Sequence, residues 1–297
     1  MLVKLIAVRM SLYLMVALGL TGGGFQVFAQ HIHLAAGAKS TAQDGQLYIV
    51  NGTTYDINST PPNTSCLFMS QDDPILYPGL YRTDATFVVL PATLWTGGPA
   101  PSAPAPGSYI ELRLVSATGP VGGEIGLWEE SVDGTSTTKL ISLPVGTSNG
   151  TNHYNLSEGD PGQGVSTPDG LDPYGHIHGR QFTASKPGLY MVGVQLLDTS
   201  KNGVNGGPIQ TPSATNYFYF QAGLFIDSMA RTNNTVTVRF GTRAFNNYLL
   251  EVNTNLVSTN WIPIEEVFGG NHSDLHYLID SNATNSVRLY RMHEIPQ

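Results

Sequence analysis

Short stretches in which apolar and polar residues alternate recur along the whole chain. In residues 109–115, Ile110, Leu112 and Leu114 fall on one face of an extended segment, while Glu111 and Arg113 fall on the other. This two-residue period predicts half-buried β-strands. The same pattern predicts strands at residues 47–50, 86–90, 125–129, 189–197, 217–221, 235–240, 248–252, 261–267 and 287–292.

These segments predict an all-β protein with two antiparallel β-sandwich domains of the immunoglobulin or jelly-roll kind, following a signal peptide. We place the domain boundary near Gly223, because an aromatic strand ends there and a new series of strand patterns follows. The predicted domains are residues 30–222 and 223–297. Two stretches rich in Gly, Pro or polar residues, 97–108 and 146–175, are predicted to be long loops of the first domain.

The first 29 residues have the pattern of a secretory signal. Lys4 and Arg9 precede an apolar run over residues 10–20, and Val27 and Ala29 supply the small residues of a cleavage site. The apolar run is shorter than the roughly 20 residues of a membrane span. We therefore expect a secreted, periplasmic or cell-surface protein whose mature chain has no transmembrane segment.

Charge and composition argue against nucleic acid as a partner and exclude some kinds of structure and metal site. The formal net charge is −8, which argues against nucleic acid as a partner because a phosphate-binding surface needs an excess of Lys and Arg. Cys66 is the only cysteine, so the sequence allows no intramolecular disulfide and no zinc site built from thiolates. Gly and Pro together number 52 and interrupt any long helix.

Two His-x-His pairs, His31/His33 and His176/His178, are the main candidates for metal binding. In a strand, residues i and i+2 share a face, so two imidazoles can converge on one zinc, copper or manganese ion. The alternative is structural: His176 and His178 cap a strand, and His31 and His33 belong to a terminal segment.

One stretch resembles a known family. Residues 175–190, with His176, His178, Phe182, Thr183 and a Pro-Gly-Leu-Tyr ending at Tyr190, are similar to the surface-anchored domain of actinobacterial cell-wall proteins. Relatives occur in planctomycete- and verrucomicrobia-like bacteria. Gly119-Pro120 through Leu127-Trp128 resembles that domain's glycine-rich turn and following strand. The signature's Trp is absent here. The resemblance implies a β-rich envelope protein that accompanies a metal transporter system.

The C-terminal segment resembles a small module that ends many secreted proteins of the same bacteria. The similar pieces are residues 248–252, 256–261 and 287–291. This resemblance implies an accessory β-module without a catalytic role.

A weaker candidate site is a calcium-type loop. Asp198, Ser200 and Asn202, followed by Gly203, match the first half of an oxygen-ligand loop. The twelfth position is Ile209, where an EF-hand has a bidentate Glu. The alternative is an Asx turn between two strands.

The sequence contains no motif of hydrolytic catalysis, because it lacks the G-x-S-x-G, H-E-x-x-H and P-loop patterns. We therefore predict no catalytic residues. The predicted function is a non-enzymatic binding or adhesion protein of the cell envelope, with an envelope or extracellular component as partner. The alternative is a secreted metalloenzyme or carbohydrate-active protein that uses the same histidines.

Overall fold

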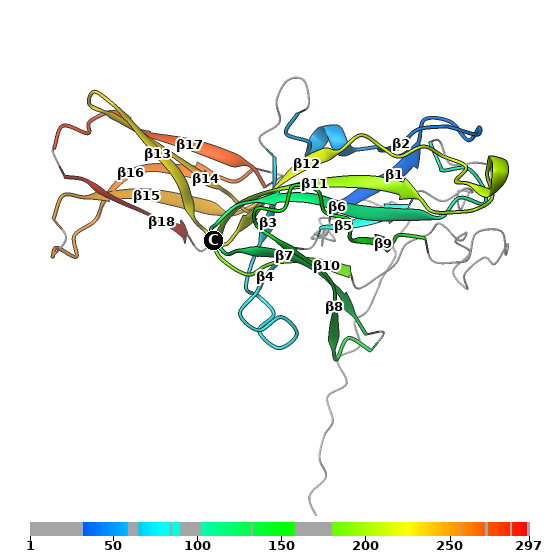
Figure 1. Cartoon of the computed structure of the whole chain (residues 1–297). Helices are drawn as coiled ribbons and strands as arrows, with labels where there is room; N and C mark the ends of the chain where they lie inside the picture. The colour runs from blue at the N-terminus through cyan, green and yellow to red at the C-terminus, as the bar shows by residue number, and fades with distance from the viewer. Residues whose placement is uncertain are drawn as a thin grey trace, which may run out of the picture. The chain divides into compact units, whose positions relative to one another are not determined.

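The computed structural model describes residues 32–58, 65–83, 85–89, 102–131, 133–157, 180–255, 257–270, 273–285 and 287–295. These residues form β-strands and two short 3₁₀ turns, η1 (Gly52–Thr54) and η2 (Val204–Gly206), and contain no α-helix. The prediction of an all-β protein is confirmed (Figure 1). No helix within these ranges has the length and apolarity needed to cross a membrane.

Three sheets are built from the strands that precede residue 223. The first has the order β2–β1–β5, the second β4–β10–β7–β8 and the third β3–β12–β11–β6–β9. Their bounds are β1 Ile32–Ala38, β2 Leu47–Ile49, β3 Cys66–Met69, β4 Tyr81–Thr83, β5 Ala85–Val89, β6 Ile110–Thr118, β7 Glu124–Glu130, β8 Thr137–Pro144, β9 His153–Asn155, β10 Arg180–Ala184, β11 Gly188–Asp198 and β12 Asn216–Ala222.

The pairing is antiparallel at most strand contacts but not at all of them. Strand β1 runs parallel to β5, and β3 runs parallel to β12. The expectation of purely antiparallel sheets is therefore wrong. Parallel neighbours cannot be joined by a tight hairpin, and here other strands lie between them in the sequence. Alternation of apolar and polar residues does not report strand direction, so the sequence pattern could not reveal this.

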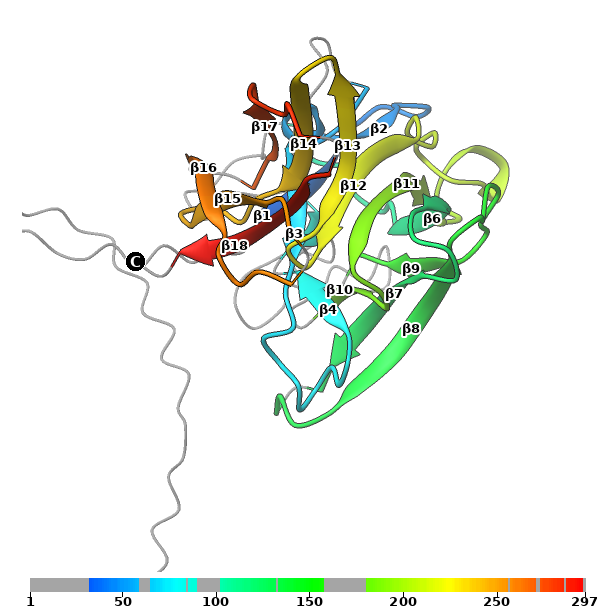
Figure 2. The ribbon, with the colours of Figure 1, turned by 90° about the vertical axis from the view of Figure 1, so that its left-hand side faces the viewer.

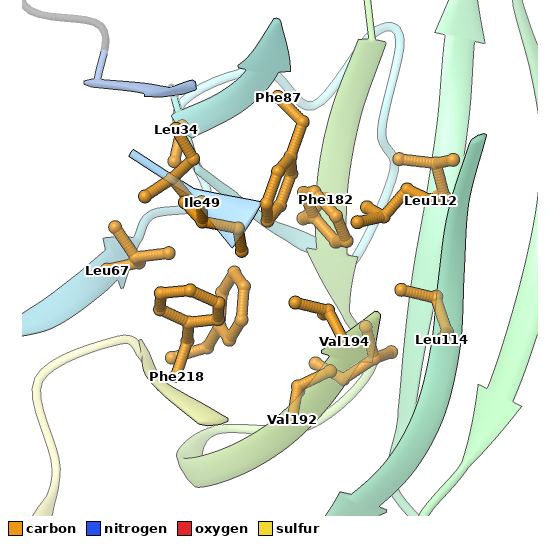
Figure 3. Close-up of a cluster of buried hydrophobic side chains, with 14 of the residues drawn as sticks. Leu34, Ile49, Leu67, Phe87, Leu112, Leu114, Phe182, Val192, Val194 and Phe218 are labelled. Atoms are coloured by element: carbon orange, nitrogen blue, oxygen red, sulfur yellow. The ribbon is translucent and has the colours of Figure 1, made fainter. Parts of the chain in front are cut away.

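One apolar cluster fills the space between these three sheets. Figure 3 shows Phe87 of β5, Phe182 of β10 and Phe218 of β12 with their rings turned toward one another. The ring centroid of Phe87 lies 5.8 Å from that of Phe182 and 6.1 Å from that of Phe218. Leu112 of β6 and Leu34 of β1 are fully buried in the same cluster. Each sheet thus contributes its apolar face to a shared core.

The remaining strands form two three-stranded sheets with the orders β13–β14–β17 and β16–β15–β18 (Figure 2). Their bounds are β13 Ile226–Thr232, β14 Thr235–Gly241, β15 Asn247–Asn253, β16 Ile262–Phe268, β17 Leu275–Asp280 and β18 Leu289–Ile295. Val238, Phe240, Tyr248 and Leu250 form the centre of a second apolar cluster between them. The alternation that predicts strands at 235–240 and 248–252 is reproduced by β14 and β15.

The two apolar clusters are connected through a buried junction. The amide of Cys66 on β3 donates a hydrogen bond to the carbonyl of Ser273, at 2.9 Å. Gly241 lies so close to Gln221 that a Cβ atom there would be 2.5 Å from the Gln221 side chain. The described residues belong to one compact unit that begins at His31. The domain boundary predicted at residue 223 stays a prediction.

Parts of both predicted loops lie outside the described residues. Of the segment 97–108, residues 102–108 are described, and of 146–175, residues 146–157. The second prediction differs from the structure in one respect, because His153–Asn155 form strand β9 against β6. Tyr154 is the single large apolar residue of that strand, so the sequence shows no alternation there.

Candidate functional site

Most of the histidines predicted to bind metal lie outside the described residues. His31, His176 and His178 lie outside the described residues, and for His33 only the backbone position in β1 is described. His153 of β9 is described, and its Nδ1 pairs with the Glu111 carboxylate. Within the described ranges, no group of three or more His, Cys, Asp or Glu side chains is arranged to hold a metal ion. Metal binding by the His-x-His pairs stays a prediction.

In the predicted calcium-type loop, backbone amides surround the carboxylate of Asp198. Its Oδ1 accepts hydrogen bonds from the amides of Tyr109 and Ser200, each at 2.9 Å. Its Oδ2 accepts hydrogen bonds from the amides of Ile209 and Gln210, at 2.9 and 3.0 Å. Four donors fill the lone-pair positions of one carboxylate. This geometry makes Asp198 an anchor for three segments of backbone.

The other two predicted ligand residues of that loop, Ser200 and Asn202, differ in their hydrogen bonding. The side-chain amide of Asn202 donates a hydrogen bond to the Gly107 carbonyl at 2.7 Å. Ser200 is buried, and its hydroxyl has no hydrogen-bond partner among the described residues. Asp198 and Ser200 form the Asx turn that the sequence left open as an alternative, and calcium binding by this loop stays a prediction.

The motif residues around Tyr190 meet in one tightly packed corner. A Cβ atom at Gly119 would lie 2.7 Å from the Tyr190 ring, and one at Gly123 would lie 2.7 Å from its hydroxyl. A Cβ atom at Gly188, where φ is +134°, would lie 2.6 Å from the Pro120 ring. Only glycine fits these approaches. The pieces that resemble the surface-anchored domain thus form a packing contact between the turn that precedes β7 and the start of β11.

Trp128 and Thr183 make a second contact between motif residues. The indole Nε1 of Trp128 on β7 donates a hydrogen bond to the Thr183 hydroxyl on β10, at 2.8 Å. The ring of Tyr77 lies edge-on to the indole at a centroid distance of 5.9 Å. The Lys139 ammonium group lies 5.6 Å from the indole centroid. The indole is therefore engaged in intramolecular contacts and ties two strands of one sheet together.

Arg180 connects the two described segments on either side of residues 158–179. Its guanidinium group is buried, lies 5.2 Å from the Tyr154 ring centroid, and donates to Glu129 Oε1 at 3.1 and 3.2 Å. It also donates hydrogen bonds to the backbone carbonyl and side chain of Asn155. Arg180 therefore holds together the two described ends on either side of that segment.

The described surface contains a pocket of about 220 Å³ beside β2 and the turn η1. The third side of the pocket is the stretch that leads into β12. The residues that line it are Lys39, Gln46, Leu47, Tyr48, Ile49, Gly52, Thr53, Asp56, Asn58, Ser213, Ala214 and Asn216. The volume is below the ~300–1,000 Å³ typical of pockets for drug-sized ligands, so a single small molecule or the end of a chain would fill it.

Three hydrogen bonds fix the carboxylate of Asp56 at this pocket. The side-chain amide of Asn216 donates to Oδ2, and the Asn58 amide donates to Oδ1 at 2.9 Å. The amide of Tyr217 lies 3.5 Å from Oδ1. A carboxylate has about four lone-pair positions, so a position remains for a ligand donor. Asp56 is the single carboxylate that lines the pocket.

Lys39 and Tyr48 also line the pocket. The Lys39 ammonium group donates one hydrogen bond, to Gln46 Oε1 at 2.7 Å, and carries two further N–H donors. The hydroxyl of Tyr48 donates to Ser102 Oγ at 2.8 Å, which fixes the orientation of the phenol ring. The lining residues of the pocket thus include hydrogen-bond donors, hydrogen-bond acceptors and one tyrosine, and its single Lys and single Asp balance in formal charge.

No protein-family model, curated protein or solved structure matches this chain. The resemblances noted in the sequence are therefore not supported by an independent match, and they remain expectations.

Sequence reasoning missed the pocket entirely. Asp56 and Asn216 are 160 positions apart in the sequence. Lys39 precedes β2 in the sequence, whereas Asp56 follows it. The only local signal is Asp56 with Asn58, an Asx-turn pattern in which a side-chain oxygen accepts the amide two residues on. Such turns are common, so this signal does not distinguish a binding site from an ordinary loop.

Proposed function

We propose that the protein is exported and acts as a non-enzymatic binding or adhesion protein of the bacterial cell envelope. The pocket beside Asp56 carries this proposal. Its carboxylate is held in place by donors from two separate segments, which is the preorganisation that binding sites use to limit the entropy cost of association. Glycoside hydrolysis requires two carboxylates flanking one bond, and the pocket lining offers one.

The sequence supports the cellular setting. Residues 1–29 have the charge and hydropathy pattern of an export signal, and the net charge of −8 disfavours nucleic acid as a partner. The partner is an envelope or extracellular component. We extend the proposal to two β-sandwich domains in the mature chain, because the two apolar clusters have separate sets of strands.

Divalent-metal binding is a second part of the proposal and rests on the His-x-His pairs His31/His33 and His176/His178. Metal analysis of the mature protein should find zinc, copper or manganese, and the double variant His176→Ala/His178→Ala should contain less. Equal metal content in the two proteins would contradict a role for the second pair. A link to a metal transporter system follows only if metal is found.

Sedimentation with isolated cell envelopes of the producing organism tests the main proposal. Mature protein should sediment with the envelopes in a saturable way, and unlabelled protein should compete with labelled protein. The supernatant should gain no new reducing ends or peptides during the incubation. Release of such products would show an enzyme, and the absence of saturable sedimentation would contradict envelope binding.

A further inference from the structure

The pocket beside β2 has features that restrict its ligand. Lys39 and Asp56 bring one positive and one negative charge to the same lining. An anion such as phosphate would meet the Asp56 carboxylate, and a divalent cation would find one carboxylate and a nearby ammonium group. Hard cations in proteins are bound by several oxygen ligands. The balance of charge therefore favours a ligand without net charge.

The hydrogen-bonding groups favour a ligand that both donates and accepts at neighbouring atoms. The Asp56 carboxylate only accepts, and the Lys39 ammonium group only donates. The amides of Gln46, Asn58 and Asn216 do both. A hydroxyl group is the smallest group that donates and accepts at one atom. A row of adjacent hydroxyls satisfies this lining better than an isolated amide or ester.

The apolar part of the lining fits the same ligand. Tyr48 and Ala214 are among the residues that line the pocket, and the Tyr48 hydroxyl is bonded to Ser102. The C–H faces of a sugar ring are apolar and pack against aromatic rings, while its hydroxyls point outward to polar groups. The volume of about 220 Å³ suits one ring rather than a long stretch of polymer.

We propose that this pocket binds one neutral sugar residue, either free or at the end of a glycan chain. Asp56 accepts a hydrogen bond from one ligand hydroxyl, Lys39 donates to another, and Tyr48 packs against the ring. This inference deepens the proposed function and rests on it, since the sugar would belong to the envelope or extracellular component that the protein binds.

Calorimetric titration of the mature protein tests the inference. The probes are glucose, galactose, mannose and N-acetylglucosamine, with glycine and glutamate as zwitterionic comparators. At least one sugar should bind saturably, and Asp56→Asn and Lys39→Met should each weaken that binding about tenfold or more, since each removes a charged hydrogen-bond partner. The matched controls Asp72→Asn and Lys201→Met lie outside the pocket and should bind as the wild type does.

Three results would overturn the inference: no saturable binding of any of the four sugars, sugar binding that both pocket variants leave unchanged, or binding of the amino acids alone. Lys39 is exposed, so Lys39→Met gives a result even where Asp56→Asn lowers the unfolding temperature. The envelope assay is read separately. Envelope retention without sugar binding contradicts the sugar inference alone, whereas sugar binding without envelope retention contradicts the envelope proposal alone.

Discussion

The hydroxyl of Tyr190 donates a hydrogen bond to the backbone carbonyl of Lys186 at 2.9 Å and accepts one from the Lys186 amide at 3.2 Å. Tyr190 itself is fully buried on β11. One side chain thus satisfies both backbone groups of a residue in the turn that precedes its own strand. Because Gly119 and Gly123 press against the same ring, this contact also fixes the turn before β7.

Replacing Tyr190 by Phe should lower the free energy of unfolding by about 1–2 kcal/mol, because the ring still packs but the Lys186 backbone groups lose their partner. Urea denaturation monitored by fluorescence measures the change. Tyr219→Phe in the neighbouring strand β12 is the matched control and should stay within about 0.5 kcal/mol of the wild type. Equal losses in the two variants would contradict the role of the hydroxyl.

Asp198→Asn should destabilise the protein by about 2–4 kcal/mol, because the amide replaces one accepting oxygen with a donor that faces backbone N–H groups. Denaturant unfolding measures this loss. Asp44→Asn is the control, since Asp44 is exposed and has a φ of +66°, which Asn tolerates well. A variant as stable as the wild type would contradict the anchoring role.

Calcium provides a separate test of the loop at Asp198. If backbone donors occupy the carboxylate, the thermal unfolding midpoint should be the same in excess EDTA and in millimolar calcium. A midpoint that rises with calcium, and does so less in Asp198→Asn, would instead support the calcium-type site predicted from the sequence.

Cys66 should be inert to thiol reagents in the folded protein. Its side chain is fully buried on β3, and burial raises the pKa of the thiol, so little reactive thiolate forms. Labelling with a chromogenic disulfide reagent at pH 8 should therefore be slow in native buffer and stoichiometric in denaturant. Fast native labelling would show that the junction beside β3 opens readily.

His276 on β17 should make stability depend on pH between about 7 and 5. Burial lowers the pKa of His276 in the folded state and outweighs the opposing effect of Asp274. The unfolded chain, with a His pKa near ~6.5, then binds more protons than the folded chain, so stability falls as the pH drops. The slope for one proton cannot exceed about 1.4 kcal/mol per pH unit.

Denaturant unfolding at several pH values measures the contribution of His276. The variant His276→Leu should show a flatter pH dependence than the wild type across this window. Ile279→Val on the same strand is the control, because Ile279 is exposed and carries no titratable group, and it should leave the slope unchanged. A His276→Leu profile parallel to that of the wild type would contradict the prediction.

One buried face accounts for some of the predicted strands, such as β11 and β14, but β16 is predicted although it is largely exposed. Residues 189–197 were predicted and β11 spans Gly188–Asp198, with Tyr190, Val192 and Val194 buried in alternation. Strand β13 is mostly exposed on both faces, and its sequence shows no alternation of apolar and polar residues. Strand β1 was missed because its Ala and Gly residues have little intrinsic preference for strands.

The candidate sites also differ in whether their residues are close together in the sequence. The residues of the motif around Tyr190 are local, so the sequence located them, but the structure gives them a packing role. The Asp56 pocket depends on segments that only the folded sheets bring together. Parallel pairing of β3 with β12 is likewise a long-range choice. Sequence periodicity carries information about which face of a strand is buried and none about which strand is its neighbour.

The parallel register that places Cys66 opposite Tyr219 has a consequence for the order of events during synthesis. A chain made from its N-terminus delivers β3 long before β12, the only strand with which β3 pairs among the described residues. The unpaired edge of β3 must therefore wait until nearly three quarters of the chain has been made. Strands left open in this way attract other chains. Rapid completion of the chain, or a factor that holds it unfolded, thus protects the protein from aggregation.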